Sequence, residues 1–99
     1  MIVAQADDVE ELTILRVSSS SAPQAVAAAV SKSIFDSHTY PTLRAIGHGA
    51  VGQAAKALAI ARGYTAARGL DLAFTIGFDT ILNDDGKEIS AIVFHTFRR

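Results

Sequence analysis

The chain contains no cysteine, and this absence removes several kinds of chemistry at once. Without thiols, the 99-residue sequence forms no disulfide, no thiol nucleophile and no cysteine-ligated zinc site. No apolar run approaches the roughly 20 residues that span a bilayer, and residues 1–11 lack the basic lead of a signal peptide. We therefore expect a cytoplasmic protein made of one small domain, without membrane contact.

Motifs that mark catalytic or metal sites are also missing. None of the three histidines has a His or Cys two to four positions further on, as a zinc site would require. The serine run at 18–21 lacks the Gly-x-Ser-x-Gly elbow of a nucleophilic serine, and there is no Gly-Lys-Ser/Thr of a P-loop. We predict no catalytic residue, no metal and no cofactor, and hence a protein that is not an enzyme.

The formal net charge is only −1, but the charges are unevenly distributed. Four of the ten acidic residues are Asp7, Asp8, Glu10 and Glu11, which leaves six acidic and all nine basic side chains after them, a balance of +3. We interpret residues 1–11 as an acidic, flexible extension and residues 12–99 as the domain. The extension either screens a basic face of the domain or serves only solubility.

No acidic residue occurs between positions 37 and 70, where an apolar run leads through a glycine turn into an alanine-rich segment. Such a turn leaves free backbone N–H groups at the positive end of the helix dipole, which favours an anion such as phosphate. Gly47, Gly49 and Ala50 therefore form a candidate anion-binding turn. Alternatively, the two glycines only allow the strand and the helix to pack closely.

Hydrophobic periodicity predicts the order βαβαββ. Strands are expected at 12–17, 42–46, 70–76 and 87–97, and helices at 23–36 and 50–61. A serine of the run at 18–21 should cap the first helix, with Pro23 in its first turn. Gly63 should end the second helix, and Gly77 should mark a bulge in the third strand. The Asn-Asp-Asp-Gly sequence at 83–86 predicts a tight turn between the last two strands.

Several segments, in this order along the chain, resemble the stage V sporulation protein S family. They lie at 14–18, 21–23, 26–27, 45–50, 53–63, 69–72 and 85–88, and include Ala-Ile-Gly-His-Gly-Ala and Gln-Ala-Ala-Lys-Ala-Leu-Ala-Ile-Ala-Arg-Gly. The resemblance covers about residues 12–96. It implies an α+β, Alba-like βαβαββ two-layer sandwich, with two helices on one face of a four-stranded sheet, that forms dimers. It also implies a regulatory role in bacterial development and sporulation, and nucleic-acid binding.

Binding of DNA or RNA through backbone phosphates would use basic side chains, supplemented by neutral hydrogen-bond donors. The candidates are Arg44, His48, Lys56, Arg62, Arg68, Ser20 and Ser21. Alternatively, the basic side chains are ordinary solvated residues. Contacts of this kind position a nucleic acid without reading its sequence, so binding should be weak and sensitive to salt.

A second functional hypothesis is a protein–protein interaction module of a developmental pathway, without nucleic-acid binding. It is favoured by the net charge of −1 and by the serine run, which lacks the lysine expected of an Alba-type DNA binder. Two helices cover only one face of a four-stranded sheet, so apolar residues elsewhere need a partner. Phe78, Ile81, Phe94 and Phe97 are candidates for a homodimer interface, or else they complete the core of the chain itself.

Overall fold

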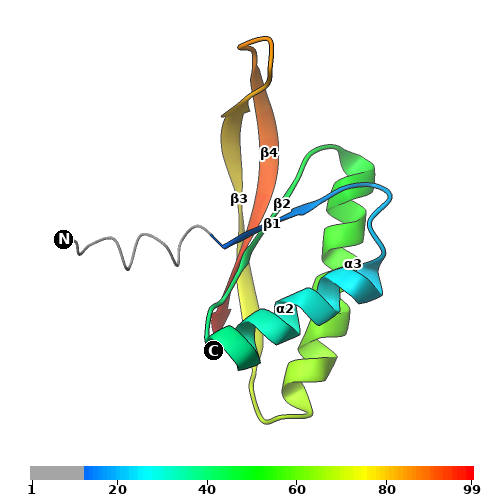
Figure 1. Ribbon diagram of the computed structural model, residues 1–99, viewed down its shortest axis with the longest axis vertical. Coiled ribbons are helices and arrows are strands. Elements are labelled where there is room, and N and C mark those ends of the chain that lie inside the picture. Colours follow the sequence, from blue (N-terminus) through cyan, green and yellow to red (C-terminus); the bar gives the residue numbers. More distant parts are fainter. Residues whose placement is uncertain (1–12) are drawn as a thin grey trace, which may run out of the picture.

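The computed structural model describes residues 13–99, so the predicted extension at residues 1–11 lies outside the described part. The elements follow the predicted order: β1 (Ile14–Val17), α2 (Pro23–Ser37), β2 (Thr42–Ala45), α3 (His48–Ala66), β3 (Leu72–Leu82) and β4 (Glu88–Arg98). In Figure 1 both helices lie on one face of a four-stranded sheet, which gives two layers. The α+β sandwich predicted from the sequence is confirmed.

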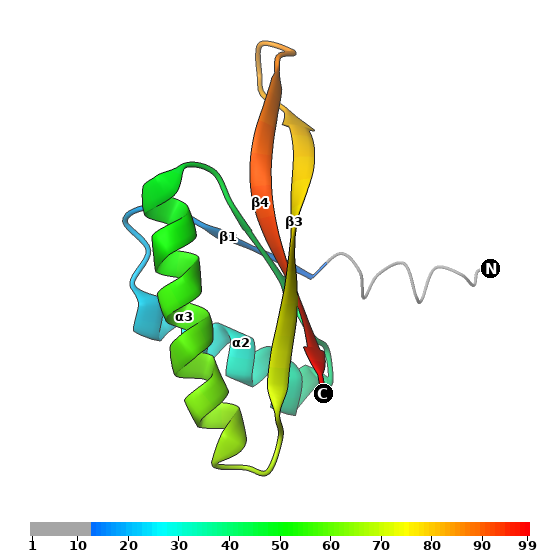
Figure 2. The same cartoon turned by 180° about the vertical axis from the view of Figure 1, so that it is seen from behind.

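The strands lie in the order β1-β2-β4-β3. β1 and β2 are parallel because α2 connects them, whereas β4 is antiparallel to both of its neighbours, β2 and β3. The carboxyl ends of two parallel strands lie at the same edge of a sheet. The loops that follow β1 and β2, and lead into the two helices, therefore meet at one corner of the molecule (Figures 1 and 2).

Side chains alternate across the two parallel strands and divide the sheet into two faces. Leu15 and Val17 of β1, like Leu43 and Ala45 of β2, pack toward the helices as part of the core. The helices contribute mostly small residues to this core: Ala27, Val30, Ile34, Ala50, Ala54, Leu58 and Ala61. We call the other side of the sheet, which the helices do not cover, the open face.

Phe94 belongs to the core and not to the predicted interface. Its side chain is 2% exposed, and its ring packs edge-on against Phe74 with centroids 5.7 Å apart. Position 94 has the same parity as Ile92, on the side of β4 that the helices cover. For Phe94 the alternative assignment, completion of the chain's own core, is therefore correct.

Two glycines do not interrupt their elements as predicted. α3 continues through Gly63 to Ala66, because Thr65 extends the buried stripe one turn beyond Ala61. The chain reverses only at Gly69, whose φ of +80° lies in the left-handed region that glycine adopts readily. Gly77 makes no bulge, since the pairing of β3 with β4 is unbroken from Leu72 to Leu82. Continuous cross-strand pairing thus extends β3 six residues beyond its predicted end.

The serine run does not cap α2. The N-cap residue is Ala22, which makes no side-chain capping hydrogen bond, although Pro23 does open the helix as predicted. The tight turn at 83–86 is confirmed: Asn83 Oδ1 accepts hydrogen bonds from the N–H groups of Asp85 and Lys87, both at 2.9 Å. This turn closes a long β3–β4 hairpin whose distal part projects beyond the helices (Figures 1 and 2).

Candidate nucleic-acid interface

Two arginines are neighbours on the open face. Arg16 of β1 and Arg44 of β2 are direct register partners, and the residues on either side of each arginine point into the core. Neighbouring strands lie about 4.8 Å apart, so both side chains start close together on the same face. Among residues 13–99, neither guanidinium takes part in an ion pair. Like charges opposite each other on adjacent strands are unfavourable, so an anion bound between them would stabilise this arrangement.

A hollow of about 450 Å³ opens beside this arginine pair. Its lining consists of Arg16, Val17, Ser18, Ser19, Arg44, Ile46 and Ile81. The hollow therefore joins the open face to the loop after β1 and to the base of the projecting hairpin. The hollow thus combines two guanidinium groups, two hydroxyl groups and three aliphatic side chains. This combination suits a ligand that is both anionic and partly apolar, such as a sugar–phosphate backbone.

The serine run forms a compact loop at the edge of this hollow. Ser18 N donates a hydrogen bond to Ser21 Oγ at 2.9 Å, and the hydroxyls of Ser18 and Ser20 lie 3.0 Å apart. Gln53 Nε2 donates to the carbonyl oxygen of Ser21 at 2.8 Å and so ties the loop to α3. Ser18 and Ser19 line the hollow with both arginines, whereas Ser21, predicted as a neutral donor, lines a neighbouring hollow with Arg16 alone. Ser20, the other predicted donor, belongs to the same loop but lines neither hollow.

The predicted anion-binding turn lies against the same loop. Gly47 is the N-cap of α3 with φ +90°, and the first turn of the helix carries neither an acidic residue nor a side-chain cap. His48 is exposed, whereas the Ala50 side chain is buried in the core, so only its backbone N–H faces the turn. Gly49 packs on Ser19, where an added Cβ would lie 2.8 Å from Ser19 Cβ. Close packing therefore requires a glycine at position 49, although its partner is the serine loop and not a strand, and a Cβ added at Gly47 would meet nothing within 4 Å.

Replacement of Gly49 by alanine is expected to lower the free energy of unfolding by about 1–3 kcal/mol, because the methyl group forces the serine loop away from α3. Gly52→Ala, in the same helix, is the matched control, since nothing lies within 4 Å of its added Cβ. This control should stabilise the protein by roughly 0.5–1 kcal/mol, because alanine favours the helical state. Urea denaturation measures both; equal effects of the two substitutions would contradict the packing described here.

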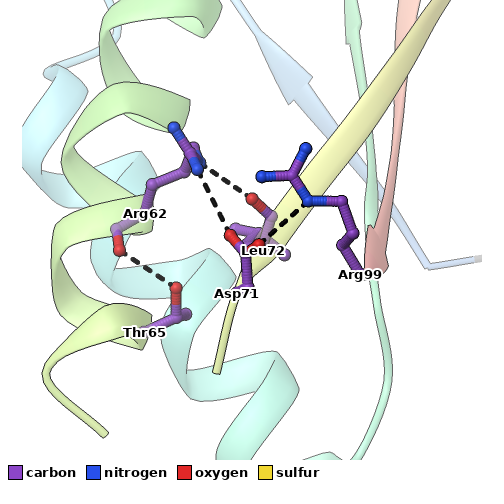
Figure 3. Close-up of polar contacts among 5 residues, drawn as sticks. All are labelled: Arg62, Thr65, Asp71, Leu72 and Arg99. Carbon is purple, nitrogen blue, oxygen red and sulfur yellow. Dashed lines mark hydrogen bonds and ion pairs between the residues drawn. The ribbon is translucent and has the colours of Figure 1, made fainter. Parts of the chain in front are cut away.

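The fold does not bring Arg62 to the arginine pair. Arg62 Nε donates to the carbonyl oxygen of Leu72 at 2.8 Å, and its Nη2 contacts Asp71 Oδ1 at 3.2 Å (Figure 3). Asp71 Oδ2 accepts a second hydrogen bond from Arg99 Nε at 2.9 Å. The bonds from Arg99 and Arg62 lower the pKa of Asp71 below its ordinary value. Arg62 thus ties α3 to the start of β3, which is a structural function.

Lys56 and Arg68 also lie apart from the arginine pair. Lys56 is exposed on α3, in the helical layer, next to Ala55, which is exposed as well. The Arg68 guanidinium stacks on the ring of Phe35, with its Cζ 3.8 Å from the ring centroid, a cation–π contact between the ends of α3 and α2. The seven predicted contact residues are therefore divided, with Arg44, His48, Ser20 and Ser21 at the corner and the other three elsewhere.

Arg16 is the residue that the sequence prediction missed. Its signal is present in the strand pattern, because Leu15 and Val17 are apolar on both sides of it and so place it on the opposite face. Its significance depends on Arg44, 28 positions away, which becomes its neighbour only once β1 and β2 pair in parallel with this register.

The other predicted interface residues are distributed over both sides of the hairpin. Phe78 is 82% exposed, and Ile76 and Leu82, on the same side of β3, are 62% and 68% exposed. Ile81 is half-buried and lines the hollow beside the arginine pair, and Phe97 is exposed near the end of β4. We call the exposed set Ile76, Phe78 and Leu82 the hairpin patch.

The fold, together with the corner where the loops after β1 and β2 meet, defines a small two-layer α+β protein with two arginines on its open face. Among residues 13–99 no three His, Cys, Asp or Glu side chains cluster as a metal site would need, and neither helix has the length and hydropathy to cross a membrane. The chain belongs to the stage V sporulation protein S (SpoVS) family, whose model matches residues 13–99. The predicted resemblance is confirmed, and family membership makes this a sporulation-related protein.

Proposed function

We propose that the protein is a non-enzymatic regulator of bacterial development that binds DNA or RNA through the backbone phosphates. The observation that supports this function most is the pair Arg16 and Arg44, adjacent on the open face and without an ion pair among residues 13–99. A guanidinium presents its donors in a planar fork that matches a phosphate, so two of them side by side suit consecutive phosphates of one strand.

The corner around the arginine pair supplies the remaining contacts. Ser20, Ser21 and the N–H groups at the start of α3 provide neutral donors, and the dipole of α3 adds positive potential at Gly47 and His48. All of these groups recognise the backbone and none requires a particular base. The proposed complex is therefore independent of sequence, and its affinity falls as salt rises because phosphate binding releases counterions.

Fluorescence anisotropy with a short labelled DNA duplex and the corresponding RNA tests this function directly. Two neutralised phosphates predict a slope of about −2 when the logarithm of the association constant is plotted against that of the salt concentration. Absence of binding to both nucleic acids at low salt would overturn the proposal.

The hairpin patch supports a second candidate function, an interaction with another protein. Three large apolar side chains exposed on one side of a projecting hairpin are typical of a contact surface. A second copy of this chain is the simplest partner, and the homodimer would then use Phe78 at its centre. Sedimentation equilibrium of the wild type and of Phe78→Ser tests this assembly: we expect a dimer that the substitution dissociates, and a monomeric wild type would exclude it.

A further inference from the structure

Ser19 differs from the three serines around it in the loop after β1. Within residues 13–99, the hydroxyl groups of Ser18, Ser20 and Ser21 hydrogen-bond to one another or to N–H groups of the loop, whereas that of Ser19 makes no hydrogen bond. Ser19 is exposed in a turn that the Ser21 N–H group closes by donating to the Ser18 carbonyl oxygen at 3.1 Å. Of these four hydroxyl groups, that of Ser19 is therefore the one that an enzyme can modify without breaking a hydrogen bond within the described chain.

The surroundings of Ser19 are positively charged. Ser19 lines the hollow of about 450 Å³ together with Arg16 and Arg44, and no acidic residue belongs to that lining. Asp79 lines a neighbouring hollow with Arg44, but the two side chains form no ion pair. Ser19 thus shares a hollow with two guanidinium groups that, among residues 13–99, have no carboxylate bound to them.

Packing holds Ser19 at the edge of this hollow. Its side chain lies against the first turn of α3, where a Cβ added at Gly49 would be 2.8 Å from Ser19 Cβ. The hydrogen bond of 2.8 Å from Gln53 Nε2 to the Ser21 carbonyl oxygen fixes the other end of the loop to the same helix. A group attached to Ser19 Oγ is therefore presented to the arginine pair from a defined position.

We infer that Ser19 is a phosphorylation site whose phosphate group binds Arg16 and Arg44. A serine/threonine protein kinase supplies the phosphoryl group from ATP. A bond forms between Ser19 Oγ and the γ-phosphorus, the bond from that phosphorus to the β–γ bridging oxygen breaks, ADP leaves, and the hydroxyl proton passes to the catalytic base of the kinase. Phosphoserine carries a charge of about −1.5 to −2 at neutral pH, which balances the two guanidinium groups, and its three terminal oxygens accept their hydrogen bonds.

The phosphate group on Ser19 occupies the two side chains that the proposed function assigns to nucleic acid. Because the group is covalently attached, its local concentration at the arginine pair is of about millimolar order or above, so it competes effectively with an external phosphate. Phosphorylation therefore switches nucleic-acid binding off. This consequence rests on the proposed function, whereas the contact between the phosphate group and the arginines does not.

The full chain with genetically encoded phosphoserine at position 19 tests the contact, and phosphoserine at position 90 is the matched control. Ser90 is exposed on β4 and has the parity of Phe94, so it lies on the side of the sheet opposite Arg16 and Arg44. In ³¹P NMR titrations of the protein alone, the phosphate at position 19 should have a lower second pKa than that at position 90, because the guanidinium groups favour the dianion. The difference should vanish when both arginines are replaced by glutamine. Equal pKa values in the presence of the arginines would overturn the contact.

Anisotropy titrations with a short labelled DNA duplex measure the consequence for binding. Phosphoserine at position 19 should weaken binding at low salt by a factor of at least about 100, as expected when two guanidinium groups are lost to the duplex. Phosphoserine at position 90 should weaken it less than about threefold. A lowered pKa at position 19, without nucleic-acid binding by any form, would support the contact and reject the proposed function. Equal weakening by both phosphoserines would show a general effect of charge and overturn the switch.

Mass spectrometry of the protein isolated from its native cells tests whether the modification is made. Trypsin cleaves after Arg16 and Lys32 and releases residues 17–32, a peptide that contains the whole serine loop. We expect phosphate on Ser19 in a fraction of the molecules. Phosphate on another serine of this peptide instead, or on none of them at any stage of growth and sporulation, would overturn the assignment.

Discussion

Replacement of both Arg16 and Arg44 by glutamine is expected to weaken binding to duplex DNA or RNA by a factor of about 10² to 10⁴ at low salt. Each substitution removes a charge-assisted hydrogen bond to phosphate worth about 1.5–3 kcal/mol, and about 1.4 kcal/mol corresponds to a factor of ten. The salt slope should fall by about 2, because two phosphates are no longer neutralised. Anisotropy titrations at several salt concentrations measure both quantities.

A matched control is available on the other layer of the molecule. Lys32→Gln with Lys56→Gln removes the same two charges from exposed positions on α2 and α3. This control should change the affinity less than threefold if the effect is local. Equal losses in the two double variants would mean that binding follows net charge alone, which contradicts an interface on the open face.

The arginine substitutions should leave the fold intact. The free energy of unfolding is expected to stay constant or to rise slightly, because glutamine relieves the repulsion between like charges on adjacent strands. Urea denaturation of the double variant separates a loss of binding from a loss of folding.

Leu58→Ala is expected to have the largest effect on stability, a loss of about 3–5 kcal/mol in the free energy of unfolding. Leu58 is completely buried in the middle of α3, and most of the helical side chains around it are alanines. Small neighbours cannot move far enough to fill the cavity that the truncation leaves. A domain of this size has a total stability of about 5–15 kcal/mol, so the variant should be close to unfolding.

Leu82→Ala is the control for this prediction at protein concentrations low enough to keep the chain monomeric, because it removes the same atoms from a side chain that is 68% exposed in the single chain. The expected change is below about 0.5 kcal/mol. Thermal and urea unfolding at one protein concentration compare the two variants. Similar losses would show that the core does not lie between the helices and the sheet as described.

The fold could be predicted from the sequence because the spacing of apolar residues indicates which face of each helix or strand is buried. Leu15 and Val17 alternate with Arg16, and Val30 and Ile34 recur at helical spacing, so each element shows which side it buries. The ends of elements were harder to predict. In the sequence, Gly63 and Gly77 look like the ends of their elements. In the structure, packing against the core extends α3 beyond Gly63, and pairing with β4 extends β3 beyond Gly77.

The candidate site was less predictable because it depends on partners that are distant in sequence. In the sequence, Arg68 and Arg62 look like free cations. In the fold, Arg68 stacks on Phe35, and Arg62 binds Asp71 and the carbonyl group of Leu72. Conversely, Arg16 gains its importance from a parallel register that no local pattern specifies. Net charge along the chain therefore indicated a basic surface without showing which of its cations are available.

The most direct test of the proposed interface is a ¹H–¹⁵N correlation experiment on the full chain titrated with a short DNA duplex. We predict that the signals of Arg16, Arg44, the serine loop at 18–21 and the turn at 47–49 shift together as the duplex is added. Shifts confined to the helical surface around Lys56 and Arg68, with the open face unchanged, would contradict the account.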